Sequence, residues 1–155
     1  MTTSLTAVIA KPLKSPAHYF EIAVPVESGR PYRIWVRGRA DGDSGLNDSV
    51  YVQFSGAVTS SGSPTMAIGT ASAATITLED CIGCGVREWG WQDNGSCVER
   101  LGAVIRFAAT GFQTIRIQTR EDGVSVDQIV LSPAAYLNVA PGAMKRDTVI
   151  LPEMW

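Results

Sequence analysis

The residues best suited to chemistry stand together in one segment. Trp89 and Trp91 flank a single glycine, and Gln92, Asp93 and Asn94 follow at once. Sugars present apolar C–H faces and a rim of hydroxyl groups, so an indole covers one face while amide and carboxylate groups orient the ring. In a strand, however, the Trp-x-Trp spacing points both rings to one side, which is often the core. The segment predicts either ligand-binding residues or core tryptophans.

A second polar cluster spans residues 41–49 (DGDSGLNDS). Oxygens from such a loop suit a hard cation such as calcium, although the spacing is not that of an EF-hand. Alternatively, the Asp and Asn side chains cap their own backbone in a solvated turn, or they contact a ligand directly. We take Asp41, Asp43 and Asn47 as candidate metal ligands and Asp48 as a candidate ligand-binding residue.

Two further acidic residues lie in the segment REDGVSVD, residues 120–127. Asp122 belongs to a turn between two predicted strands and is a candidate ligand-binding residue. Asp127 falls inside an apolar run, where a carboxylate needs hydrogen-bond donors or a metal as its partner. It is therefore the most informative acidic residue of the chain.

The three cysteines, Cys81, Cys84 and Cys97, leave several uses open. A zinc site needs a fourth ligand, and the only histidine, His18, is far upstream. A disulfide that staples a loop fits an extracellular domain. Reduced, buried thiols are the remaining alternative.

Signals for catalysis are weak. The chain has one histidine and no Gly-x-Ser-x-Gly elbow, so a Ser-His-Asp triad finds no support. Carboxylate pairs of the kind that hydrolyse glycosides are available, but nothing in their spacing selects a pair. We therefore expect no enzymatic activity, with a small glycan-active hydrolase as the last alternative. The carboxylates considered are Asp43, Asp48, Glu79, Asp93 and Asp122.

The elements that must position these residues are β-strands. Apolar and polar residues alternate repeatedly with period two, and no segment shows a sustained helical period. Seven or eight short strands with frequent turn signals predict an all-β, antiparallel sandwich or jelly roll, with one face of each sheet buried and the other wet. The clearest strands are predicted at 19–26, 32–40, 50–54, 103–108, 112–119 and 125–132.

Composition limits the number of domains and the classes of partner. A chain of 155 residues with 45% hydrophobic content suits one domain. Its net charge of −2 offers no basic surface for nucleic acid, and no apolar run is long enough for a membrane helix. We divide the chain into an N-terminal extension (1–18), a β-sandwich body (19–135) and a tail (136–155) that docks on the body or on a neighbouring chain.

These patterns resemble carbohydrate-binding modules of families six and thirty-five, which are galactose-binding-like jelly rolls. The likeness lies in residues 20–40, 47–56 and 113–131, above all in Tyr-x-Ile-x-Val-Arg at 32–37 and Val-Asp-x-Ile-x-Leu at 126–131. The CIGCG and WGWQDNG segments are also similar to glycan-binding modules of large proteins from environmental bacteria. The resemblance implies a non-catalytic carbohydrate-binding module, secreted or at the cell surface. A structural or adhesive spacer domain is the alternative function.

The resemblance also implies site residues. Asp127 becomes a ligand of a structural calcium ion, although the family's earlier Glu-x-Glu pattern is absent before Phe20. The sugar site maps onto Trp89, Trp91, Asn94 and the Asp122 turn. Truncated opening strands imply an open sheet edge, which favours a homodimer or strand exchange.

Overall fold

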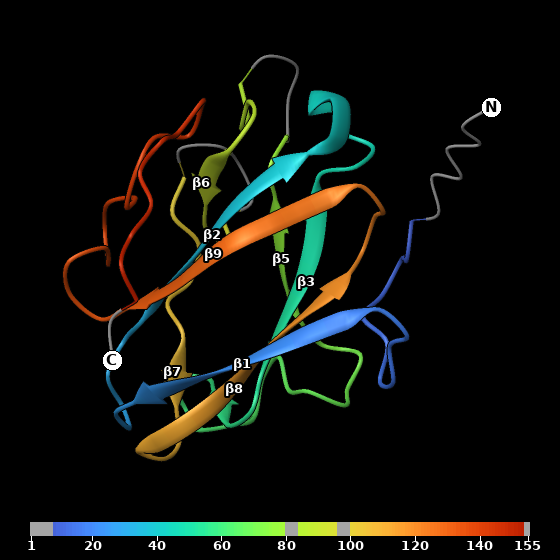
Figure 1. Cartoon of the computed structure of the whole chain (residues 1–155). Helices are drawn as coiled ribbons and strands as arrows, with labels where there is room; N and C mark the ends of the chain where they lie inside the picture. Colours follow the sequence, from blue (N-terminus) through green and yellow to red (C-terminus); the bar gives the residue numbers. More distant parts are fainter. Residues whose placement is uncertain (1–7, 80–83, 96–99, 154–155) are drawn as a thin grey trace.

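The computed structural model describes residues 8–79, 84–95 and 100–153 (Figure 1). Within these ranges the chain is all-β: apart from the three-residue 3-10 turn η1 (Asp41–Asp43), every regular element is a strand. The prediction of an all-β fold is confirmed. In this part of the chain, no helix has the length and apolarity to cross a membrane. The strands are β1 (Tyr19–Val26), β2 (Arg33–Ala40), β3 (Ser49–Phe54), β4 (Ala57–Val58), β5 (Ala74–Thr77), β6 (Gly90–Gln92), β7 (Arg106–Phe107), β8 (Gly111–Thr119) and β9 (Val124–Ser132).

The strands form antiparallel sheets, as the alternation predicts. A four-stranded sheet has the order β1-β8-β3-β5, a three-stranded sheet the order β6-β2-β9, and β4 pairs with β7. Strands β1 and β8 pair over their whole length, from Tyr19 opposite Gln118 to Val26 opposite Gly111. The register of β2 and β9 shifts once, between Arg37 and Gly38.

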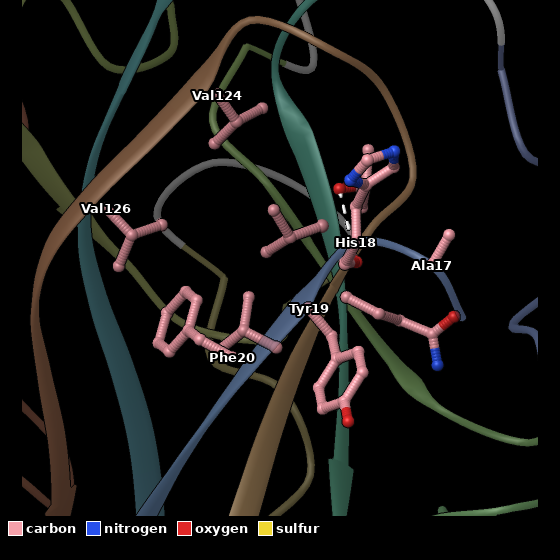
Figure 2. A pocket seen from close by; sticks show the side chains of 10 residues that line it. Ala17, His18, Tyr19, Phe20, Val124 and Val126 are labelled. Atoms are coloured by element: carbon pink, nitrogen blue, oxygen red, sulfur yellow. Dashed lines mark hydrogen bonds between the residues drawn. The ribbon is translucent and has the colours of Figure 1, made fainter. Parts of the chain in front are cut away.

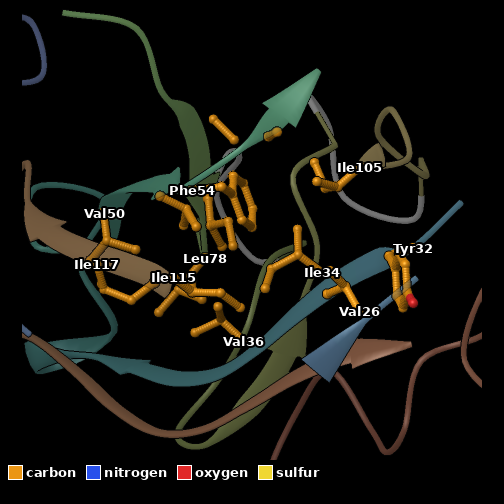
Figure 3. Packing of buried hydrophobic residues seen from close by; sticks show 14 of the residues in the cluster. Val26, Tyr32, Ile34, Val36, Val50, Phe54, Leu78, Ile105, Ile115 and Ile117 are labelled. Carbon is orange, nitrogen blue, oxygen red and sulfur yellow. The ribbon is translucent and has the colours of Figure 1, made fainter. Parts of the chain in front are cut away.

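The hydrophobic core lies between the two larger sheets (Figure 3). Ile34 and Val36 of β2 face Val52 and Phe54 of β3, and all four are at most 1% exposed. Each of these strands contributes alternate residues to the core, because successive side chains point to opposite faces of a sheet. This arrangement is the one that a β-sandwich requires.

The outer face of the three-stranded sheet departs from the expectation that it is wet. Arg33, Trp35 and Arg37 point away from the core along β2, yet each is at most 5% exposed. Residues 133–153, which we call the C-terminal strap, cover them (Figure 1). Arg33 Nε donates to the carbonyl oxygen of Leu137 at 2.8 Å, and Trp35 Nε1 donates to that of Tyr136 at 2.7 Å. Strap carbonyls thus satisfy polar groups that would otherwise need water.

The outer face of the four-stranded sheet is covered in the same way by the N-terminal segment. The Tyr51 hydroxyl donates to the carbonyl oxygen of Ile9 at 2.8 Å. The Gln118 amide accepts from the backbone N–H of Leu13 at 2.9 Å and donates to its carbonyl oxygen at 3.2 Å. Tyr51 and Gln118 are consequently buried. Period two identifies the two faces of a strand, but it does not reveal that a distant segment covers the outer one.

Strands β1 and β9 are two of the edge strands of the larger sheets, and β5 and β6 are the other two. Pro25 lies in β1 and has no N–H to offer a neighbouring strand. In β9, Arg37 lies opposite Gln128 and Gly38 opposite Val126, so Asp127 is the extra residue of a bulge. Prolines and bulges are features that protect sheet edges against pairing with another chain.

The strap is held by a buried ion pair. Arg37 Nε donates to Asp147 Oδ2 at 2.7 Å, and Arg37 Nη2 donates to the backbone oxygen of Asp147 at 2.6 Å. The two side chains are 4% and 1% exposed. Asp147 Oδ2 also accepts from the indole of Trp91 at 3.1 Å. Although burial alone raises the pKa of Asp147, the hydrogen bond and charge of Arg37 outweigh it and lower that pKa.

We predict that Asp147→Ala lowers the free energy of unfolding by about 3–5 kcal/mol, because the buried Arg37 loses its buried partner and keeps only the more exposed Asp127. Asp127→Ala is the matched control, since Asp127 pairs with the same guanidinium but is 34% exposed. Its expected loss is at most about 1 kcal/mol. Urea denaturation at pH 7 measures both values. Equal losses would show that the strap does not depend on Asp147.

Candidate functional site

Two pockets stand out in the described part of the chain. The first, which we call the strap pocket, has a volume of about 390 Å³ and lies between the C-terminal strap and strands β2 and β6. The sheet and the loop after β6 supply Trp35, Trp91, Gln92, Asp93, Arg100 and Leu101, and the strap supplies Asn138, Val139, Ala140, Gly142 and Met144. The pocket therefore exists only because the strap docks on the sheet.

Two indoles form part of the wall of the strap pocket. Trp35 is 4% exposed and Trp91 is 1% exposed, so each ring presents only a small area to the pocket. Both ring nitrogens donate to the strap, to the carbonyl oxygen of Tyr136 and to Asp147 Oδ2. Trp91 is thus buried beneath the strap, outside the hydrophobic core between the sheets, and it also borders a pocket. Ligand binding by Trp91 stays a prediction.

Trp89 takes a different place. It is half-buried, and the guanidinium carbon of Arg37 lies 5.2 Å from its ring centroid. Its backbone oxygen accepts from the N–H of Asp147 at 2.8 Å. Trp89 and Trp91 therefore contact the same ion pair, but Trp89 does not border the strap pocket.

Asp93 joins the described residues on either side of the segment 96–99. Its Oδ1 accepts from the N–H of Gly95 at 3.0 Å, and its Oδ2 accepts from the N–H of Gly102 at 2.7 Å. Arg33 Nη1 lies 3.6 Å from the same Oδ2, so the charge of the carboxylate is balanced by a guanidinium. Asn94 Nδ2 donates to the carbonyl oxygen of Ala103 at 3.1 Å, and Asn94 is not part of the pocket wall. Of the predicted segment, Trp91, Gln92 and Asp93 are brought to the pocket.

Asp48 and Asp122 lie elsewhere. Asp122 is exposed on the turn between β8 and β9, and Asp48 is 2% exposed. The prediction that Asp48 contacts a ligand directly is therefore corrected. Its side chain is buried, and its Oδ2 accepts from the N–H of Glu79 at 3.0 Å. Glu121, the main partner of Asp48, was not among the site residues predicted from the sequence.

The carboxyl groups of Asp48 and Glu121 share a hydrogen bond. Glu121 Oε2 further accepts from the N–H of Asp48 at 3.0 Å and from Ser49 Oγ at 2.8 Å. Burial, and then the neighbouring Glu121, raise the pKa of Asp48 to about 7. Burial also opposes ionisation of Glu121, but its hydrogen bonds to Asp48 and Ser49 prevail and lower its pKa. The pair therefore holds a single proton over a wide range of pH.

The candidate calcium ligands are not brought together. Asp127 forms an ion pair with Arg37, so the donor that this carboxylate needs is a guanidinium, and the arrangement does not fit a metal there. Asp43 Oδ1 accepts from the N–H of Glu88 at 2.8 Å, while Asp41 and Asn47 belong to the turn around Ser44. Among the described residues, no three His, Cys, Asp or Glu side chains are close enough to share a metal ion.

Cys84 is disulfide-bonded, and Cys81 and Cys97 lie outside the described residues. A zinc site that uses the Cys84 thiolate is therefore excluded, since a disulfide sulfur is not a thiolate. His18 lies at the start of β1 and is exposed.

The second pocket, which we call the edge pocket, has a volume of about 360 Å³ (Figure 2). It lies where β1 begins, β8 ends and β9 begins, and Phe20, Val124 and Val126 border it together with His18. None of these residues is a candidate from the sequence, because their proximity depends on how the two sheets pack.

We predict that the stability of the protein falls as pH rises from 5 to 7.5. The folded state keeps the Asp48 proton up to about pH 7, whereas the unfolded chain loses it near 3.8. The slope attributable to this proton is at most about 1.4 kcal/mol per pH unit. Asp48→Asn retains a hydrogen-bond donor for Glu121 and should remove this slope.

Urea denaturation across that range provides the measurement, with the exposed Asp122→Asn as the control that keeps the slope. A slope that is identical in the wild type and Asp48→Asn would contradict the shared proton.

Comparisons with known proteins found no match: no family model, curated protein or solved structure matches this chain.

Proposed function

We propose that this domain is a non-catalytic carbohydrate-binding module and that the strap pocket is its binding site. The observation that carries the proposal is the composition of that pocket, in which two indoles meet Gln92, Asp93, Arg100 and Asn138. Apolar surface beside a few oriented polar groups is what a sugar ring requires, because it has C–H faces and a hydroxyl rim.

The volume of the strap pocket and its exposed rim residues suit a small ligand that binds at shallow depth. Its volume of about 390 Å³ lies within the usual range for small-molecule sites. Arg100 and Asn138 are exposed, so their polar groups are free to reach a ligand from solvent. Leu101 and Val139, which are 40% and 60% exposed, offer apolar contact at the rim. Since the indoles themselves expose little, we expect affinities on the order of micromolar to millimolar.

The state of the carboxyl groups favours binding over hydrolysis. Glycosidases need two carboxyl groups that flank the scissile bond, separated by about 5 Å or more. Asp93 pairs with Arg33 and accepts hydrogen bonds from two backbone N–H groups. Asp48 and Glu121 are buried and hydrogen-bonded to each other, which leaves no room for a substrate between them.

The proposal extends to fold type and location. We assign the sandwich to the galactose-binding-like jelly rolls on the strand patterns that resemble that group. The disulfide at Cys84 supports a secreted or cell-surface protein, because disulfides persist in oxidising compartments.

A structural or adhesive spacer domain is the second candidate, and one observation favours it. Trp89 and Trp91 both contact the buried Arg37–Asp147 pair, so they serve the packing of the strap. Under this alternative the strap pocket is a packing defect between the strap and the sheet, and no glycan binds there.

We predict that Asn138→Ala weakens glycan binding at least tenfold, about 1.4 kcal/mol, because an exposed hydrogen-bonding group of the pocket is lost. Arg100→Ala should do the same, whereas Arg39→Ala, which removes an exposed arginine of β2 outside the pocket, should leave affinity unchanged. A panel of plant and bacterial polysaccharides identifies the ligand, and isothermal titration calorimetry then measures each variant.

Two results would count against the proposal. Folded protein that binds no glycan across a broad panel would favour the spacer domain. Binding that survives both pocket substitutions would place the sugar site elsewhere.

A further inference from the structure

We propose that the edge pocket binds a small, uncharged molecule with an apolar body of one or two rings and a single polar group. This site is separate from the strap pocket and does not rest on the proposed function. It lies at the open end of the sandwich, and Figure 2 shows the side chains of Phe20, Val124 and Val126 around the same space.

At this pocket the core is covered less completely than at the other end of β1. Phe20 and Val26 belong to the same core-facing row of β1, yet Phe20 is 42% exposed and Val26 is 4% exposed. Val50 and Ile117, which line the pocket, are members of the hydrophobic core. Concave apolar surface that remains in contact with water is unfavourable, and burying it beneath an apolar ligand releases free energy.

The volume indicates the size of the ligand. An engineered apolar cavity of about 150 Å³ holds one benzene ring. The edge pocket measures about 360 Å³ and is open on one side. It therefore has room for one or two fused rings, with one edge of the molecule left at the mouth.

The charge of the wall indicates the class of ligand. Among the described residues that line the edge pocket, there is no Asp, Glu, Lys or Arg. The Gln118 amide is already bound to Leu13 and Gln53 on the outer face of the sheet. The Thr119 hydroxyl donates to the carbonyl oxygen of His18 at 3.5 Å, so it can only accept from a ligand. That hydroxyl oxygen and the imidazole of His18 are the wall groups for a polar group of the ligand. While the His18 imidazole is neutral, an ion would lose hydration here without gaining a charged partner, so a neutral molecule is favoured.

The test compares 2-naphthol with 2-naphthoate, which share one apolar body and differ in charge. Titration of the isotope-labelled protein is followed by NMR, and His18 gives one set of imidazole signals because it is the only histidine. We expect saturable shifts at the residues of the edge pocket with 2-naphthol, and binding of 2-naphthoate at least tenfold weaker. Intermolecular nuclear Overhauser effects to the methyl groups of Val50, Ile117 and Val124 locate the ligand in the wild-type protein.

Phe20→Ala should weaken 2-naphthol binding about tenfold, since it removes a wall of the pocket. Phe112→Ala is the matched control: it removes a phenylalanine that is 70% exposed in the same sheet but outside the pocket, and it should leave binding unchanged. The inference is overturned by an absence of saturable shifts, by unaltered binding in folded Phe20→Ala, or by equal binding of 2-naphthoate. The wild-type Overhauser contacts decide the matter should Phe20→Ala not fold.

Discussion

The buried pairing of Arg37 with Asp147 is the interaction on which the functional surface depends. Arg37 points away from the core, where a guanidinium would ordinarily meet water, and Asp147 comes from a segment 110 residues later. The same aspartate accepts from Trp91 and from the N–H of Ala143, so it joins the sheet, an indole and the strap. A charge removed from water in this way requires its partner, which makes the docking of the strap specific.

The strap pocket follows from that docking. On its sheet side, β2 is buried on both faces from Arg33 to Gly38, while its other wall belongs to a segment held by a few polar anchors. Gly142 illustrates how closely the two walls approach: a Cβ added there would come within 2.7 Å of the Trp91 indole nitrogen. Any ligand of this pocket therefore contacts both walls, and its affinity is linked thermodynamically to the stability of the strap.

The second buried polar cluster, Asp48 with Glu121, is stabilised by a shared proton and not by opposite charges. Arg37 and Asp147 stabilise one another as ions, whereas Asp48 and Glu121 coexist because one of them keeps a proton. This carboxyl pair ties the start of β3 to the turn after β8, close to the residues that line the edge pocket. The two clusters therefore secure opposite sheets and respond to pH in opposite directions.

The sequence by itself determined the β-strands, their two faces and the need of Asp127 for a partner, because period two and the cost of burying a carboxylate are local properties. It did not determine which partner: hydrogen-bond donors and a metal were both consistent with the residues. Only the tertiary structure decided that the outer face of β2 is covered, that Trp91 packs beneath the strap on that same face, and that Asp147 and Glu121 matter. Those outcomes depend on contacts between segments about 50 to 110 residues apart, and no local pattern encodes a partner at that distance.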